Sequence, residues 1–155
     1  MFGFKYKRRE WIRNQPFPEN WLEILEKNIL YYHQLNSEDQ AELRGHIQIF
    51  LNEKEFEGFD GLEITDEIKV TIAEQACILL IHRETDYYPT LHTILVYPHP
   101  FYSQIKHRLE GGIIEEAEQG RLGESWYRGP VILAWDDVQL SAHDYNDGHN
   151  VVFHE

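Results

Sequence analysis

The sequence predicts a single α+β domain, with helices in its first half and a small mixed sheet after them. The chain has 155 residues, of which 42% are hydrophobic and 14% aromatic, a composition typical of a globular protein with a substantial core. Apolar residues recur at helical spacing up to about residue 80, whereas β-branched apolar runs appear after residue 90. We expect an N-terminal arm over residues 1–18 and one domain over residues 19–155.

Two helices are predicted near the N-terminus. Asn20 is a suitable cap for a helix over residues 21–34, which has apolar side chains along one face. Ser37 and Gln40 have the spacing of a capping box, so a second helix is expected to begin there. Its apolar residues continue at helical spacing to the neighbourhood of Lys54.

A turn and a third helix follow. Gly58 and Gly61 interrupt the helical pattern and indicate the turn. Thr65 or Asp66 then begins a helix whose inner face is apolar. Cys77 lies within this apolar helix, and no basic residue is close to it in the sequence. We therefore expect a buried, unreactive thiol.

Two clear strands are predicted in the second half. Residues 93–97 are β-branched and apolar and end at Pro98, and residues 131–135 form a similar run. Residues 112–115 are a candidate for a further short strand. The segment 136–148 is polar and is expected to consist of turns.

The final residues predict the start of one more helix. Asn150 is a suitable cap, and Val151, Val152 and Phe153 would begin a buried face. Isolated helices below roughly 12–15 residues are marginal in water. We therefore expect a domain that is incomplete at its C-terminus, cut within this helix, and of low stability.

The charge balance excludes several classes of function. With 14 Lys and Arg against 27 Asp and Glu, the net charge is -13, and such a surface repels phosphate backbones, so nucleic-acid binding is excluded as the main role. No run approaches the roughly 18 apolar residues that a membrane span needs. Because Cys77 is the single cysteine, no internal disulfide can form, which favours a cytoplasmic protein.

Basic and aromatic residues are concentrated in the first thirteen positions. The basic ones are Lys5, Lys7, Arg8, Arg9 and Arg13. An ordinary basic arm is the favoured interpretation, and an interfacial membrane anchor is the alternative.

Nine histidines raise the question of a metal site. Six have no ligand spacing and are expected in surface or capping roles: His33, His46, His82, His92, His99 and His107. A loop metal bound by His143, Asp144 and His149 is a weaker alternative to an acidic solvated loop. The same loop does not fit a calcium-binding pattern, because Gly148 comes one position early.

An ordered series of residues resembles the MtfA-like family of zinc-dependent peptidases. The series consists of Phe50-Leu51 with Lys54, Gly61-Leu62-Glu63-Ile64-Thr65-Asp66, Ile72-Ala73-Glu74-Gln75-Ala76-Cys77-Ile78-Leu79-Leu80, Ile94-Leu95-Val96-Tyr97-Pro98 with Phe101, Gly123-Glu124-Ser125-Trp126, Gly129-Pro130-Val131-Ile132-Leu133-Ala134-Trp135 and Gly148-His149-Asn150-Val151-Val152-Phe153-His154-Glu155. In the family the last run continues into the rest of an H-E-x-x-H motif, in which two imidazoles on one helix face hold Zn²⁺.

The resemblance implies roles for particular residues. His154 corresponds to the first zinc ligand and Glu155 to the general base that accepts a proton from the metal-activated water. It also implies a zincin-like architecture of the gluzincin type, with the metal helix beneath a small sheet. In that setting a buried core strand is favoured for residues 131–135, and a strand along the substrate cleft is the alternative. The residues concerned are Val131, Ile132, Leu133, Ala134 and Trp135.

The sequence therefore favours part of a cytoplasmic zinc metallopeptidase that acts on a peptide or protein. The chain itself supplies one of three protein ligands for Zn²⁺, so we expect it to be inactive and to bind zinc weakly. The alternative is a non-catalytic interaction module that binds a regulatory protein and keeps a vestigial His154-Glu155.

Overall fold

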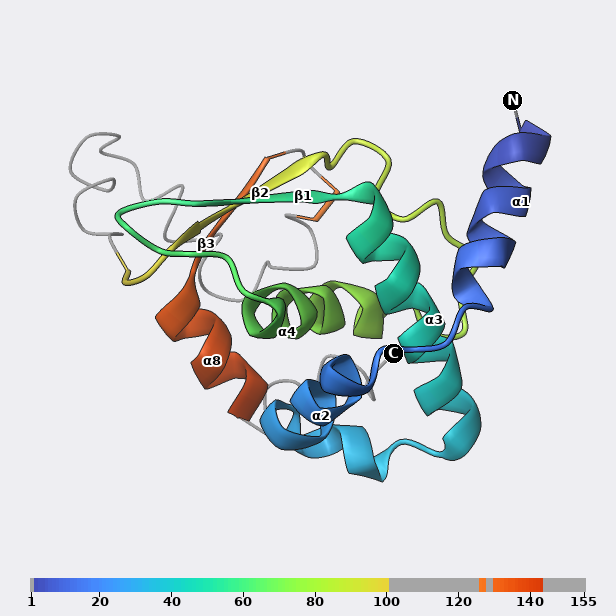
Figure 1. Cartoon of the computed structure of the whole chain (residues 1–155), viewed down its shortest axis with the longest axis horizontal. Helices are drawn as coiled ribbons and strands as arrows, with labels where there is room; N and C mark the ends of the chain where they lie inside the picture. Colours follow the sequence, from blue (N-terminus) through green and yellow to red (C-terminus); the bar gives the residue numbers. More distant parts are fainter. Residues whose placement is uncertain (1, 101–125, 128–129, 144–155) are drawn as a thin grey trace.

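The computed structural model describes residues 2–100, 126–127 and 130–143 (Figure 1). The helices and strands in this part are α1 (Phe2–Arg13), α2 (Glu19–Asn28), the 3-10 helix η1 (Leu30–Gln34), α3 (Ser37–Glu53), β1 (Glu55–Gly58), α4 (Asp66–Cys77), the 3-10 helix η2 (Ile78–Leu80), β2 (Thr93–Tyr97), β3 (Val131–Ala134) and α8 (Trp135–His143). The α+β class is confirmed. The predicted order of helices first and strands afterwards is wrong, because β1 lies between α3 and α4.

The described strands form one sheet in the order β1-β2-β3, and both pairings are parallel. The mixed pairing expected from the sequence is therefore not found among them. Ile94 on β2 is the partner of Phe56 on β1 and of Val131 on β3. Parallel neighbours need a crossover connection, and α4 supplies it between β1 and β2.

Helix α4 is the central helix of the fold. Figure 1 shows it directly beneath the sheet, with α2 on its other side and α8 and α3 at its two ends. The packing is consistent with this view, since α4 contacts α2, α3 and α8. Most of its side chains are buried, including Ile72, Ala73 and Ala76, which are fully inaccessible. The rest of the domain therefore packs around α4.

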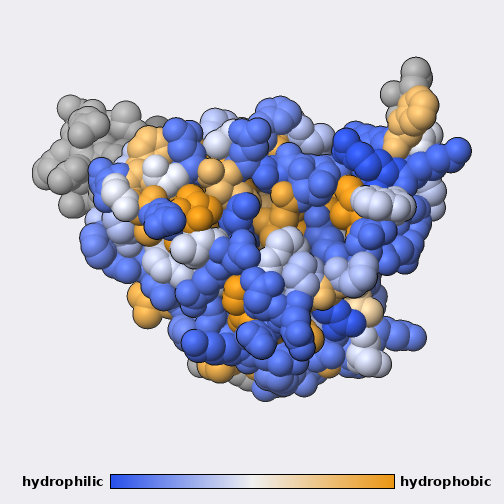
Figure 2. Space-filling model, in the orientation of Figure 1, coloured by the Kyte–Doolittle hydropathy of each residue, from blue (hydrophilic) through white to orange (hydrophobic). Residues whose placement is uncertain are grey.

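The surface seen in Figure 2 is mostly hydrophilic, with hydrophobic residues in small separate patches. This agrees with the acidic composition and with the burial of the large apolar side chains. The largest fully buried residues include Trp126, Tyr32, Tyr88 and Phe50, and Trp126 packs with its ring 6.2 Å from that of Phe50. Several of the aromatic side chains thus contribute to the core.

The first predicted helix is divided in the structure. Helix α2 ends at Asn28, Ile29 is extended with φ -111° and ψ 99°, and η1 follows. The break lets two consecutive tyrosines be buried in different directions: Tyr31 bonds to Glu74 on α4, while Tyr32 accepts a hydrogen bond from Arg44 on α3. Local spacing did not reveal this break.

Two of the predicted caps are also wrong by one or two residues. Pro18, not Asn20, precedes the first turn of α2, and Asn20 instead donates to Asp66. Asn36 caps α3 by accepting from the backbone N–H of Asp39 at 2.8 Å, so Ser37 is already helical. The predicted start of the third helix at Thr65 or Asp66 is confirmed, because α4 begins at Asp66 and Thr65 caps it by accepting from the N–H of Ile68.

Strand β1 was not predicted. Its four residues have little strand propensity, and pairing with β2 decides their conformation. Gly58 belongs to this strand rather than to the turn. A Cβ at Gly58 would lie 2.1 Å from the carbonyl oxygen of Leu62, so only glycine allows this close approach. The turn itself follows at Asp60 and Gly61, both of which have positive φ.

The basic N-terminal segment contains helix α1, which packs against α3. Arg9 holds it there: its guanidinium donates to both carboxylate oxygens of Glu53, at 2.7 and 2.9 Å, and to Asp86 at 2.8 Å. It also lies 4.8 Å from the centre of the Tyr87 ring. The predicted strand at 112–115 and the predicted last helix lie outside the described residues.

Candidate active site and a cluster of metal-ligand residues

Strand β3 is an edge strand of the described sheet. Val131 and Ala134 are buried, Leu133 is half-buried, and Ile132 is 50% exposed. The strand pairs with β2 on one side only. Among the residues that the structure describes, no strand lies on the other side of β3. An extended peptide would need such an unoccupied edge in order to pair with the strand.

Trp135 is not part of the strand, contrary to the sequence prediction. It is the first residue of α8, and residues 136–143, predicted as turns, continue this helix. Asp136 and Asp137 stabilise the first turn, because carboxylates interact favourably with the N-terminal end of a helix. Val138 and Ala142, four residues apart, provide the buried face. The buried face consists of only two residues within a polar stretch, so the sequence did not reveal this helix.

Two contacts fix the junction between β3 and α8. The Asp136 carboxylate lies 2.8 Å from Nδ1 of His99, just after β2, and Gln75 on α4 donates to the carbonyl of Val138 at 3.0 Å. The edge strand is thus connected to both the sheet and the central helix.

A buried polar pair lies between α4 and η1. The Glu74 carboxyl is fully inaccessible and accepts a hydrogen bond from the hydroxyl of Tyr31. Burial raises the pKa of Glu74 to about 8, and burial and the neighbouring carboxyl raise the pKa of Tyr31 well above its usual value. Among the described residues, the second oxygen, Oε1, has no hydrogen-bond partner.

Cys77 is also buried, one turn along α4 from Glu74, as expected. Burial and the nearby carboxyl raise the pKa of its thiol well above the ordinary value. A thiol in this state is a poor nucleophile, so Cys77 belongs to the core.

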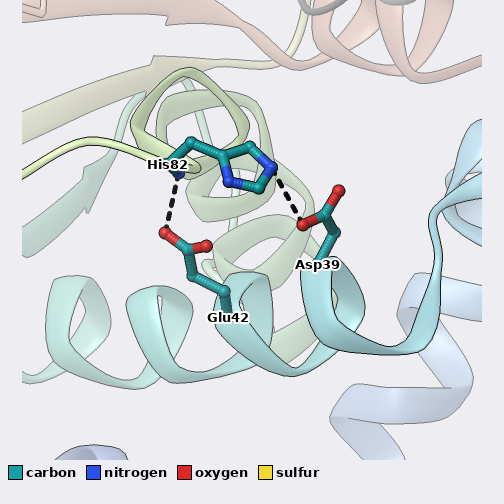
Figure 3. A group of neighbouring side chains, drawn as sticks. All are labelled: Asp39, Glu42 and His82. Carbon is teal, nitrogen blue, oxygen red and sulfur yellow. Dashed lines mark hydrogen bonds and ion pairs between the residues drawn. The ribbon is translucent and has the colours of Figure 1, made fainter.

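Asp39, Glu42 and His82 form a cluster that the sequence did not indicate (Figure 3). Nε2 of His82 lies 3.0 Å from the Asp39 carboxylate, and the backbone N–H of His82 donates to the Glu42 carboxylate at 2.9 Å. Asp39 and Glu42 are one turn apart on α3, but His82 is too distant in sequence for any spacing rule to find it.

His46 supports this cluster from inside the protein. Its Nε2 lies 2.9 Å from the Glu42 carboxylate and its Nδ1 lies 2.6 Å from the hydroxyl of Tyr87. The surface or capping role expected for His46 is wrong, because the residue is buried and lies in the interior of α3. Burial lowers its pKa, which favours the neutral ring. Glu42 and His46 are four residues apart on α3, and this spacing could have indicated from the sequence that their side chains meet.

Of the remaining predicted site residues, His143 alone is among those described. His154, Glu155, Asp144 and His149 lie outside the described ranges, and His143 is the last residue of α8.

Comparison with known proteins identifies the family. The family described as glucose-regulated metallo-peptidase M90 matches residues 4–155. The chain belongs to this family. The predicted resemblance to MtfA-like peptidases is confirmed, since several relatives of the chain are named Mlc titration factor A.

The relatives are longer proteins. An uncharacterized protein of Synechocystis is 39% identical over 149 residues, which cover 96% of this chain and 54% of that protein. Mlc titration factor A of Klebsiella pneumoniae is 29% identical over 155 residues, or 100% of this chain and 56% of the relative. The corresponding protein of Salmonella typhimurium is 27% identical over the same share of each chain. The chain thus spans a little over half the length of these relatives.

Membership of the M90 family implies a metal. His154 and Glu155, the expected zinc ligand and general base, lie at the end of the matched segment. In the described part of the chain, the group of three side chains suited to a metal consists of Asp39, Glu42 and His82. His154 and Glu155 lie outside the described residues. No helix in the described ranges is long and apolar enough to cross a membrane.

Proposed function

We propose that this chain is part of a zinc-dependent peptidase domain that hydrolyses peptide bonds with a metal-activated water. The observation that carries the proposal is the match to a metallo-peptidase family over residues 4–155, which ends on His154 and Glu155. A histidine followed by a glutamate is the first half of the H-E-x-x-H pattern.

Each of the two residues has a separate role in this proposal. His154 would hold zinc through its neutral imidazole, together with ligands from the remainder of the domain. Zinc, when bound, lowers the pKa of a bound water and polarises the substrate carbonyl. Glu155 would accept the proton from the attacking water and pass it to the leaving amine.

Strand β3 is the proposed binding edge for the substrate. An extended peptide beside β3 would gain main-chain hydrogen bonds from the strand and an apolar contact from the exposed Ile132. The contacts at Asp136 and Val138 would hold this edge in place. We further propose a zincin-like arrangement in which the metal helix lies beneath the sheet, and a cytoplasmic location, consistent with a single buried cysteine.

A non-catalytic role is the second candidate. Relatives are named Mlc titration factor A, a name that describes titration of Mlc by those proteins. By analogy, this chain would bind a regulatory protein and keep His154-Glu155 as a vestige. The coding DNA after codon 155 distinguishes the two, because an in-frame continuation that completes H-E-x-x-H favours the peptidase.

The decisive experiment uses the complete gene product that contains this chain. We expect Glu155→Gln to retain zinc, measured by elemental analysis, and to lower hydrolysis of an unfolded protein such as casein by about 100-fold or more. His154→Ala should lose activity together with the zinc bound at the peptidase site, so the zinc content should fall by one equivalent per chain. Glu63→Gln, an exposed glutamate far from the motif in sequence, is the matched control. Undiminished hydrolysis by the Glu155→Gln variant would exclude the proposed role of Glu155.

A further inference from the structure

We propose that Asp39, Glu42 and His82 bind a divalent transition-metal ion, with Zn²⁺ as the best fit, at a second site separate from the proposed peptidase zinc. The site lies between the first turns of α3 and the segment that follows η2. It uses none of the residues assigned to hydrolysis.

The geometry of the three side chains suits one ion. Each offers a ligand atom, and these atoms all lie within 4.8 Å of one another. The His82 Nε2 to Asp39 Oδ1 distance is 3.0 Å. Two ligands at about 2.0–2.2 Å from a tetrahedral zinc are separated by a little more than this, so small side-chain movements would admit the ion. Figure 3 shows the His82 ring turned toward Asp39 and the Glu42 carboxylate beside the backbone of His82.

Glu42 is held in place before any ion arrives. Its Oε2 accepts from the backbone N–H of His82 and lies 2.9 Å from Nε2 of His46. The side chain of His46 is only 5% exposed, and Tyr87 fixes its other nitrogen. Both contacts use the same carboxylate oxygen, Oε2, and Glu42 offers a ligand atom to the cluster. Hydrogen bonds of this kind orient metal-binding carboxylates and increase their affinity.

The donor set selects the type of ion. One imidazole nitrogen and two carboxylates suit zinc and its first-row neighbours, whereas calcium prefers six or more oxygen ligands. The two carboxylates carry two negative charges, which a divalent cation would neutralise. The side chains of Asp39, Glu42 and His82 are 18%, 31% and 71% exposed, so water can complete the coordination and the ion can exchange.

A bound ion would connect two segments of the core. His82 follows the end of α4 and η2, and Asp39 and Glu42 lie near the start of α3. We therefore expect zinc to raise the thermal stability of the chain.

The test uses the 155-residue chain with His154→Ala, so that the proposed peptidase site cannot contribute. Zinc binding is measured by isothermal titration, and Co²⁺ binding by its visible absorption. We expect one equivalent of zinc per chain and a higher melting temperature with zinc. His82→Asn keeps a residue type that tolerates the positive φ at this position. It should weaken zinc binding at least about tenfold, and His46→Gln should do the same by releasing Glu42.

His33→Asn, which alters an exposed histidine outside the cluster, is the matched control and should bind zinc as the parent does. Circular dichroism establishes that each variant is folded. Absence of zinc binding in the parent, or equal binding after His82→Asn, would overturn the proposed site. Neither result bears on the peptidase proposal, because every chain used in this experiment carries His154→Ala.

Discussion

Glu74 is the residue in the described structure where burial has the clearest consequence for solution behaviour. Its carboxyl is fully inaccessible and its pKa is raised from 4.5 to about 8. The folded protein therefore keeps a proton that the unfolded chain releases near pH 4.5. The stabilisation associated with this proton is complete below about pH 4.5 and is lost as the pH rises through 8.

Replacing Glu74 with glutamine tests this relation. Glutamine has nearly the same shape, can accept from Tyr31, and does not ionise. We expect the melting temperature of the wild type to fall between pH 5 and 8 more steeply than that of Glu74→Gln. Thermal unfolding followed by circular dichroism measures both slopes, with Glu63→Gln as an exposed control. Equal slopes for the wild type and Glu74→Gln would show that Glu74 is already ionised in the folded protein.

At the scale of elements, Arg9 makes the most extensive polar contact between α1 and the rest of the described structure. The bidentate contact of Arg9 with Glu53 is largely buried, since the two side chains are 12% and 13% exposed. Lysine keeps the charge but cannot form the paired hydrogen bonds. We expect Arg9→Lys to weaken the docking of α1 by roughly 1–2 kcal/mol.

Hydrogen exchange of the α1 amides measures this change. Exchange in α1 should be about tenfold faster in Arg9→Lys, because 1.4 kcal/mol corresponds to a factor of ten, whereas the amides of α4 should be unaffected. Arg8→Lys is the matched control, because Arg8 is more exposed and makes a single contact with Glu53 at 3.3 Å. Unchanged exchange in α1 after Arg9→Lys would mean that the paired hydrogen bonds of Arg9 do not contribute to the docking of the helix.

At the scale of the whole molecule, the number of zinc ligands determines the activity expected of these 155 residues. The proposed peptidase site receives one imidazole from this segment, whereas catalytic zinc sites use three protein ligands. We expect the isolated 155-residue chain to cleave no peptide bond and to bind zinc through His154 only weakly.

This prediction is tested in the His82→Asn variant, which removes the proposed second site. Isothermal titration with zinc should then reveal no tight site, and incubation with casein should leave the substrate intact. Sub-micromolar binding of one zinc per chain in this variant, lost on His154→Ala, would contradict it.

The elements predicted correctly were those with a strong local signal. Residues 93–97 are β-branched and apolar, and Thr65 caps an apolar helix, so both were found without knowledge of the fold. The elements missed depend on contacts between distant segments. Strand β1 forms because β2 is beside it, and α8 forms because α4 and β3 receive its buried face.

The sequence by itself determined the α+β class, the family and the pair His154-Glu155 on which the peptidase proposal rests, because residue periodicity and motif order can be read directly from the chain. Only the tertiary structure decided the environment of Glu74, the docking of α1 and the meeting of Asp39 and Glu42 with His82. These depend on burial and on distances between residues far apart in sequence, and folding alone brings them together.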